Sequence, residues 1–197
     1  MRKFIIVYAS VLICPAPAWA GSVSPEEFHR KVYVLHQQQI AQREIRTQEK
    51  TDNYSGAAAA GYGFVDTRYY DASSGRLLSY VRRDAAKPEN LHIVEVNVYQ
   101  NGRLVRDFGS MTLPWAPLRP VRTFINLHHY NGGLHSFRQY DLHGEVGYEF
   151  CEGAFAGKPV RISLDYSGIT ETIKATADYK ACFDGMESSW ARYLTPH

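Results

Sequence analysis

The sequence predicts a mainly β protein, in which an antiparallel meander is curled into a barrel or a sandwich and one α-helix precedes it. Three observations support this fold class. After Phe64 the apolar residues change from a helical period to strict alternation, which is the period of a half-buried strand. Short runs of β-branched and aromatic residues are separated by glycine-containing turns. Most connections are short enough for hairpins, which favours neighbouring strands that pair in sequence order.

The first twenty residues have the organisation of a secretory signal peptide. Two basic residues precede an apolar run over residues 4–14, and Ala18-Trp19-Ala20 forms a small-x-small cleavage site. Prolines at positions 15 and 17 end the run well before the roughly twenty residues that a membrane-spanning helix needs. We therefore expect residues 1–20 to be removed, leaving an exported, soluble chain without a membrane span, in the periplasm or outside the cell.

Composition limits the kinds of partner. The precursor has 22 Lys and Arg against 20 Asp and Glu, and its two excess basic residues lie in the signal segment. The mature chain is therefore formally neutral, whereas a nucleic-acid binder normally has a basic excess. We expect no nucleic-acid partner. The length of the mature chain suits one domain with a sizeable core.

Two cysteines, Cys151 and Cys182, remain after removal of the signal. An even pair in an oxidising compartment predicts a disulfide bond. The sequence contains no Cys-x-x-Cys pair that would point to a metal site instead.

A helix is expected at the start of the mature chain. Ser24 can serve as its N-cap, Pro25 suits its first position, and Glu27 completes a capping box. Apolar residues then recur at helical spacing, and the pattern predicts a helix from Pro25 to about Gln48, within an N-terminal segment 21–50. A glycine- and alanine-rich stretch, 51–63, is expected to be a flexible joint before a β domain over 64–197.

About nine strands are expected in the β domain. The clearest are Leu91–Tyr99 and Pro159–Asp165, in which valine, isoleucine and leucine alternate with polar residues. The others are expected at Arg68–Tyr70, Arg76–Arg82, Arg103–Phe108, Val121–Tyr130, His135–Tyr140, Glu145–Phe150 and Ile169–Ala177. Met186–Leu194 is expected to form a short terminal helix.

Histidines flank an Asn-Gly-Gly turn and form a candidate metal site. If Asn131-Gly132 is a two-residue turn, His128 lies opposite His135, and a three-residue loop would pair His129 with His135. Either register makes two imidazoles cross-strand neighbours that could share a divalent ion. In the first register Asp141 lies on the same face and could supply a third, oxygen ligand. The alternative is a hydrogen-bonded or solvent-facing pair of histidines beside a turn.

Arginine and aromatic residues recur through the strands and form a candidate binding surface, since both dominate interfaces and aromatic rings also stack on sugars. The residues selected for this surface are Arg76, Tyr80, Arg103, Arg106 and Trp115. Trp115 lies in the proline-rich stretch Leu113–Pro120, which either covers the core with Trp115 as its anchor or exposes Trp115 for docking.

No nucleophile-containing motif such as Gly-x-Ser-x-Gly accompanies the histidines. The sequence therefore favours an exported, non-enzymatic binding or assembly module with a protein or saccharide partner, and it assigns no catalytic residue and no cofactor. The alternative is a small hydrolase or metal-dependent enzyme that uses the histidine cluster.

Overall fold

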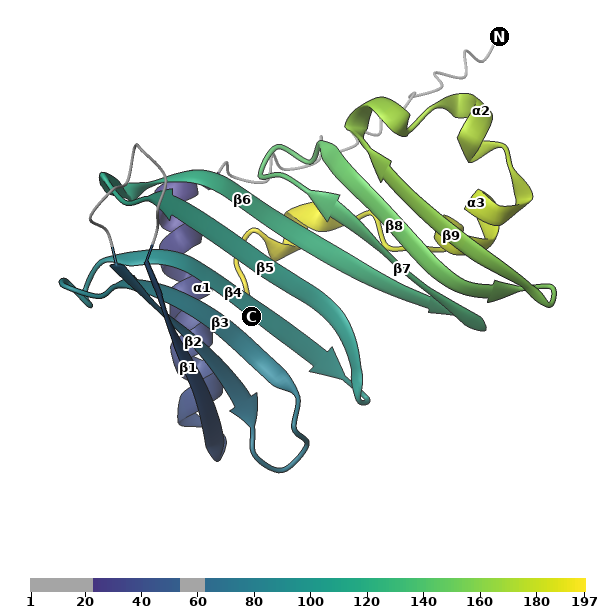
Figure 1. Cartoon of the computed structure of the whole chain (residues 1–197). Helices are drawn as coiled ribbons and strands as arrows, with labels where there is room; N and C mark the ends of the chain where they lie inside the picture. The colour runs from purple at the N-terminus through teal and green to yellow at the C-terminus, as the bar shows by residue number, and fades with distance from the viewer. Residues whose placement is uncertain (1–22, 54–62) are drawn as a thin grey trace, which may run out of the picture.

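A computed structural model describes residues 23–53 and 63–197, so the predicted signal peptide and most of the predicted joint lie outside the described residues. Nine antiparallel strands form one sheet in sequence order (Figure 1). The strands are β1 (Ile45–Asn53), β2 (Gly63–Asp71), β3 (Leu77–Asp84), β4 (Leu91–Gln100), β5 (Arg103–Leu113), β6 (Ala116–Asn131), β7 (Gly133–Tyr140), β8 (Val146–Phe155) and β9 (Lys158–Asp165). The helices are α1 (Pro25–Ala41), α2 (Glu171–Lys174) and α3 (Ala177–Phe183), with 3₁₀ turns η1 (Tyr166–Gly168) and η2 (Trp190–Tyr193).

The predicted fold class is confirmed: the described chain is a mainly β meander with an N-terminal helix. Within the described residues β1 and β9 are the two edges of the sheet and do not pair with each other, so the barrel is not formed. A layered, sandwich-like arrangement fits, in which helices provide the second layer.

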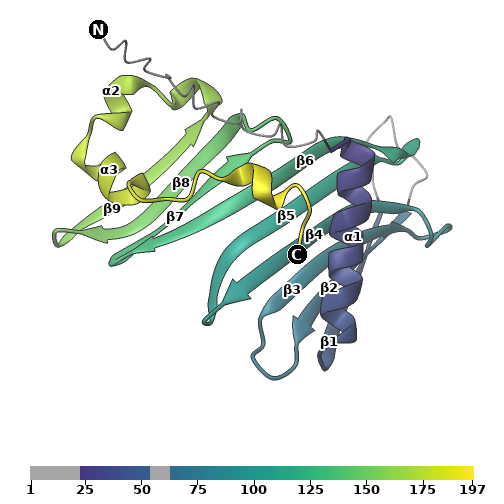
Figure 2. The same ribbon diagram turned by 180° about the vertical axis from the view of Figure 1, so that it is seen from behind.

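The helices lie on one face of the sheet, which we call the inner face. Figure 2 shows α1 across β3–β6 and the C-terminal segment beside it, whereas Figure 1 looks onto the opposite, outer face. The helix α3 packs on β6, β7 and β8, again on the inner face. None of the helices in the described chain covers the outer face of the central strands.

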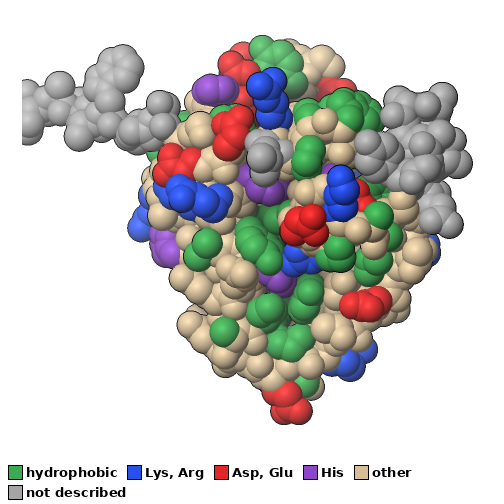
Figure 3. All heavy atoms as spheres, turned by 90° about the vertical axis from the view of Figure 1, so that its left-hand side faces the viewer, with side chains coloured by type: hydrophobic (Ala, Val, Ile, Leu, Met, Phe, Trp, Pro, Cys, Tyr) green, Lys and Arg blue, Asp and Glu red, His purple; other side chains and the backbone are tan. Residues whose placement is uncertain are grey.

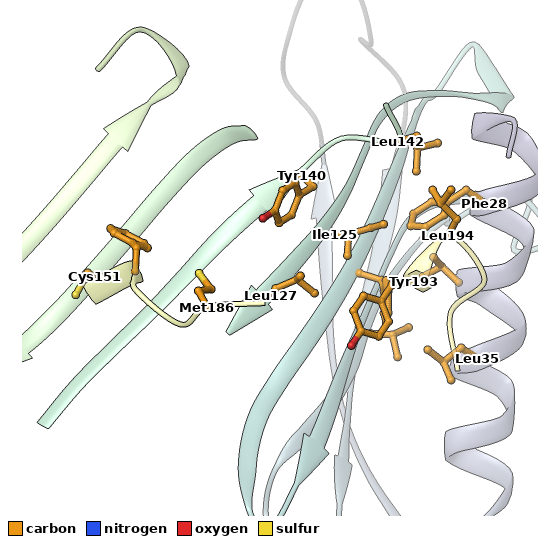
Figure 4. Packing of buried hydrophobic residues seen from close by; sticks show 14 of the residues in the cluster. Phe28, Leu35, Ile125, Leu127, Tyr140, Leu142, Cys151, Met186, Tyr193 and Leu194 are labelled. Carbon is orange, nitrogen blue, oxygen red and sulfur yellow. The ribbon is translucent and has the colours of Figure 1, made fainter. Parts of the chain in front are cut away.

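The core lies between α1, the C-terminal segment and the inner face. Figure 4 shows Phe28 and Leu35 of α1 directed toward Tyr193 and Leu194. The ring of Phe28 also meets Phe108 of β5 edge to face, with 6.4 Å between the ring centres. Burial of these side chains holds α1 on the sheet. The packing also stabilises the helix itself, since an isolated helix with such a thin apolar stripe would not be stable.

A buried histidine supplies a second kind of contact beneath α1. His36 is only 1% exposed, and its Nδ1 lies 2.8 Å from Oγ of Ser79 in β3. Its ring packs against Tyr33 and Tyr69. Burial, with a smaller effect of the Arg83 charge, lowers the pKa of His36 from 6.5 to about 4.

This pKa predicts a loss of stability in acid. As the pH falls below 6.5 the unfolded chain takes up a proton at His36 and the folded chain does not, so stability declines until about pH 4 and then levels off. The shift corresponds to about 3 kcal/mol. In urea unfolding at pH 7 and pH 4, the variant His36→Phe/Ser79→Ala should lose about 3 kcal/mol less than the wild type between the two pH values, because it lacks this proton uptake. Parallel pH profiles for the two proteins would contradict this assignment.

The predicted helix is too long. The observed helix, α1, ends at Ala41, and the side chain of Arg43 donates to the carbonyl of Gln39 at 3.2 Å. Residues 45–53 form β1 instead. Every residue of β1 has a partner in β2. This pairing overrides the helical propensity of the Gln-Glu-Lys stretch, which sequence reasoning assigned to the helix. The N- and C-terminal ends of the expected joint are likewise parts of β1 and β2.

The predicted strand Ile169–Ala177 is also wrong, because this segment contains α2 and the start of α3. The hydroxyls of Thr170 and Thr176 accept from the backbone N–H groups of Ile173 and Tyr179, so each threonine is a helix N-cap. Two short capped helices therefore replace the ninth expected strand, and β1 supplies the ninth observed one. Near the C-terminus the expected helix is the single turn η2.

The predicted disulfide bond is confirmed, and it joins β8 to α3 through Cys151 and Cys182. Beside it, the hydroxyl of Ser136 donates to the carbonyl of Cys182 at 2.7 Å. Both contacts hold α3 over the inner face of β7 and β8.

Candidate functional site

The outer face carries stacked pairs of arginine and aromatic side chains. The guanidinium of Arg68 lies 5.3 Å from the ring centre of Tyr80, and that of Arg103 lies 5.0 Å from the ring centre of Tyr130. Arg46 over Tyr70 and Arg122 over Phe124 repeat the arrangement at 4.6 and 5.7 Å. Such stacking holds a guanidinium parallel to the sheet while its N–H groups stay accessible.

The structure separates the five residues selected from the sequence for a binding surface. Tyr80 and Arg103 belong to outer-face pairs, and Arg76 lies in the turn before β3 with its guanidinium 5.5 Å from the Tyr99 ring centre. Arg106 lies opposite Leu127 on the inner face, 4.6 Å from the ring centre of Tyr193. The odd spacing of Arg103 and Arg106 along one strand places them on opposite faces.

Trp115 lies in the tight turn between β5 and β6 and is 54% exposed. Of the two sequence interpretations, the structure therefore agrees with the exposed loop and not with an anchor over the core. We expect Trp115→Ala to change the free energy of unfolding by less than about 0.5 kcal/mol, as for other surface positions. Urea unfolding measures this directly, and a loss above about 2 kcal/mol would show that the ring is an anchor after all.

His128 and His135 do come together on the outer face, although in a different register from either expected one. The turn consists of Gly132 and Gly133, so Tyr130 lies opposite His135 and His128 is the diagonal neighbour. His128 Nδ1 lies 3.0 Å from His135 Nε2, and the planes of the two rings are nearly parallel, at 9°. The two nitrogens are thus within hydrogen-bond distance, and one of them donates to the other.

A carboxylate that the sequence did not indicate completes this cluster. Asp107 Oδ2 lies 2.7 Å from His128 Nε2, and because a carboxylate only accepts, this nitrogen carries a proton. Burial, followed by the neighbouring His128, lowers the pKa of His135. The result is a hydrogen-bonded chain from Asp107 through His128 to His135.

Asp141 does not join the histidines. Its Oδ1 accepts from the backbone N–H groups of His143 and Glu145, both at 2.8 Å, and so stabilises the turn between β7 and β8. Across the part of the chain that the structure describes, no group of three or more His, Cys, Asp and Glu side chains is arranged to hold a metal ion.

Planar polar side chains extend the cluster across three strands. Asn126 Nδ2 donates to Asp107 Oδ1 at 2.8 Å, and Gln139 Nε2 donates to Asn126 Oδ1 at 3.1 Å. Arg122 in turn donates to Gln139 Oε1 at 3.3 Å. These bonds fix the planes of two amides and one guanidinium against the sheet.

A second candidate site is a cleft of about 730 Å³ on the inner face, between β7–β8 and the helices α2 and α3. At its base Glu149, only 1% exposed, accepts from Arg138 Nε at 2.6 Å and from the Tyr179 hydroxyl at 2.9 and 2.8 Å. Burial and the bond to Glu149 raise the pKa of Tyr179 to about 12. Sequence reasoning missed this trio, although Glu149 alternates with the buried Cys151, which was a signal for an inward carboxylate.

Charges of both signs are interspersed on the surface. Figure 3, seen from the side of β1, shows acidic and basic side chains mixed with apolar ones. No helix among the described residues has the length and apolar character needed to cross a membrane.

No known protein family, curated protein or solved structure matches this chain.

Proposed function

We propose that this protein is an exported, non-enzymatic binding module and that the outer face of its sheet is the binding surface. The observation that carries the proposal is the set of arginine–aromatic pairs on a sheet face that no described helix covers. Arginine and tyrosine lose little conformational freedom on binding when they are already stacked, which favours recognition.

Two observations support the proposal of export. The pattern of residues 1–20 predicts a signal peptide, and the bond between Cys151 and Cys182 is compatible with an oxidising compartment. The balanced charge of the mature chain supports a partner other than nucleic acid.

Hydroxyl-radical footprinting would test the binding surface while the partner is still unidentified. The mature protein is oxidised with and without a cell-envelope and extracellular extract from its own source, and the modified side chains are located by mass spectrometry. We expect protection of the outer-face residues Tyr80, Tyr130 and Tyr148. Tyr166, which is 74% exposed at the mouth of the inner cleft, serves as the control and should stay reactive. Protection confined to Tyr166, or no protection at all, would overturn the proposal.

A second candidate function is a small hydrolase or metal-dependent enzyme, and the chain of Asp107, His128 and His135 is the observation that favours it. A carboxylate that orients one imidazole is a common support for a metal-bound or proton-transferring histidine. Zinc or copper titration distinguishes the two functions: a rise in the melting temperature that His135→Gln abolishes would favour the enzyme. An unchanged melting temperature would remove the metal-dependent form of this candidate.

A further inference from the structure

The central part of the outer face of β6, β7 and β8 consists of planar side chains. Between Arg122 at one end and Gly133 and Ala154 at the other, register and alternation place ten residues, and every one has an aromatic ring, an imidazole, an amide or a carboxylate. We call them the planar patch: Phe124, Asn126, His128, Tyr130, His135, Phe137, Gln139, Tyr148, Phe150 and Glu152. None of these ten positions holds an aliphatic side chain, which is unusual for a strand face that is half buried.

Six of the seven rings of the planar patch form a continuous series, in which His135 and His128 are joined through their nitrogens. Tyr130 stacks on His135 with 4.7 Å between ring centres, and His128 lies 5.4 Å from Phe137. Phe137 then meets Phe150 and Tyr148 at 5.4 and 5.7 Å. The rings therefore form a broad, apolar platform that extends over three adjacent strands.

The backbone is adapted to this platform at one position. Phe124 lies over Gly109 of β5, where any Cβ would overlap the aromatic ring. Gly109 thus leaves room for the ring to lie close against the sheet.

Polar groups of the patch are oriented and retain hydrogen-bonding capacity. An amide offers two donors and two acceptor lone pairs. The bonds that join Asn126 and Gln139 to their neighbours use one donor and one lone pair of each amide. Each amide keeps one donor and one acceptor, the combination that a hydroxyl group requires.

The charges of the patch and its border balance. Glu152, Asp107 of β5 and Asp165 of β9 are acidic, while Arg103, Arg122 and Arg161 are basic. Neither a polyanion nor a strongly cationic partner would gain much electrostatic attraction from such a surface. The complement is a neutral ligand with apolar faces and hydroxyl groups at its edges.

We propose that the planar patch binds a neutral saccharide chain, with sugar rings packed on the aromatic platform and hydroxyl groups bonded to Asn126, Gln139 and Glu152. This inference rests on the proposed function and specifies its ligand. Three strands span about 10 Å and six residues along β6 span about 20 Å, which gives the patch an elongated outline suited to several sugar rings in a row.

The footprinting assay with pretreated extracts separates this inference from the proposed function. Periodate cleaves the vicinal diols of saccharides, and protease removes protein partners. We expect protection of Tyr130 and Tyr148 to vanish after periodate treatment and to survive protease treatment of the extract. Protection that survives periodate and vanishes with protease would overturn the saccharide and leave the binding module standing. If untreated extract gives no protection, both fail.

A matched pair of variants tests whether the ring plane is responsible. Binding of maltohexaose, cellohexaose and xylohexaose, all of which have vicinal diols, is measured by saturation-transfer NMR and calorimetry on the mature, oxidised protein. We expect at least one of these neutral hexasaccharides to bind, and Phe137→Leu, which keeps an apolar side chain of similar size, to weaken it about tenfold. Tyr166→Leu, outside the patch, should leave the affinity unchanged. Failure of all three saccharides to bind, or equal affinity of Phe137→Leu and the wild type, would overturn the proposal.

Discussion

Replacing Arg138 by methionine should lower the free energy of unfolding by about 3 to 5 kcal/mol. Arg138 provides the positive charge beside Glu149, a carboxylate that is 1% exposed at the base of the inner cleft. Without the guanidinium, Glu149 retains, among the described residues, only the hydroxyl of Tyr179 as a side-chain donor. A buried charge that has lost its partner is far more costly than a missing surface ion pair. Urea unfolding at pH 7 would measure the loss.

A combined variant provides the control. In Arg138→Met/Glu149→Leu/Tyr179→Phe the whole polar trio is replaced by apolar groups of similar size, and most of the lost stability should return. A loss below about 1 kcal/mol at pH 7 would show that Glu149 finds another donor or water.

Removing the disulfide bond should be about as damaging. In the chain-entropy model, closing the 31-residue separation between Cys151 and Cys182 stabilises the fold by about 3 to 4 kcal/mol. We expect Cys151→Ala/Cys182→Ala to lose this amount in urea unfolding. Hydrogen exchange of the backbone amides should become faster in α3. In α1 the exchange rates should change only as much as the loss of global stability requires, because the bond attaches α3 and not α1 to the sheet.

Reductant is the matched control for this variant. Dithiothreitol should lower the stability of the wild type toward that of the double variant and leave the double variant unchanged. A double variant within about 1 kcal/mol of the oxidised wild type would instead show that buried contacts of α3, such as that between Ser136 and the Cys182 carbonyl, hold the helix without the bond.

The sequence was sufficient for the meander because alternation and short glycine turns are local signals. It was insufficient for β1, whose polar residues form a strand only because β2 offers a partner for each of them. The segment Ile169–Ala177 had an apolar pattern that resembled a strand, but capping by Thr170 and Thr176 turned it into helices. The first error arises because a contact with another strand decides the structure of β1, and the second because local helix caps outweigh the alternation of apolar residues.

The candidate site shows the same limit. Turn chemistry was enough to expect two neighbouring histidines across the hairpin, but it left open whether His128 or His129 lies beside His135, and the structure has neither expected register. Turn chemistry could not identify Asp107. This residue belongs to β5, and the pairing of β5 with β6, rather than the β6–β7 hairpin, brings it to His128. Asp141 was expected nearby because it follows β7, but the turn after that strand uses its carboxylate.

The sheet order also has a kinetic consequence. Each strand pairs with its immediate neighbour in sequence, from β1 to β9, so every new strand can add to a template that already exists. The loop that must close at each step is short, and its entropic cost is correspondingly small. A chain that emerges from its N-terminus first can therefore build the sheet in the order of synthesis, and the covalent bond to α3 forms at the end of that sequence.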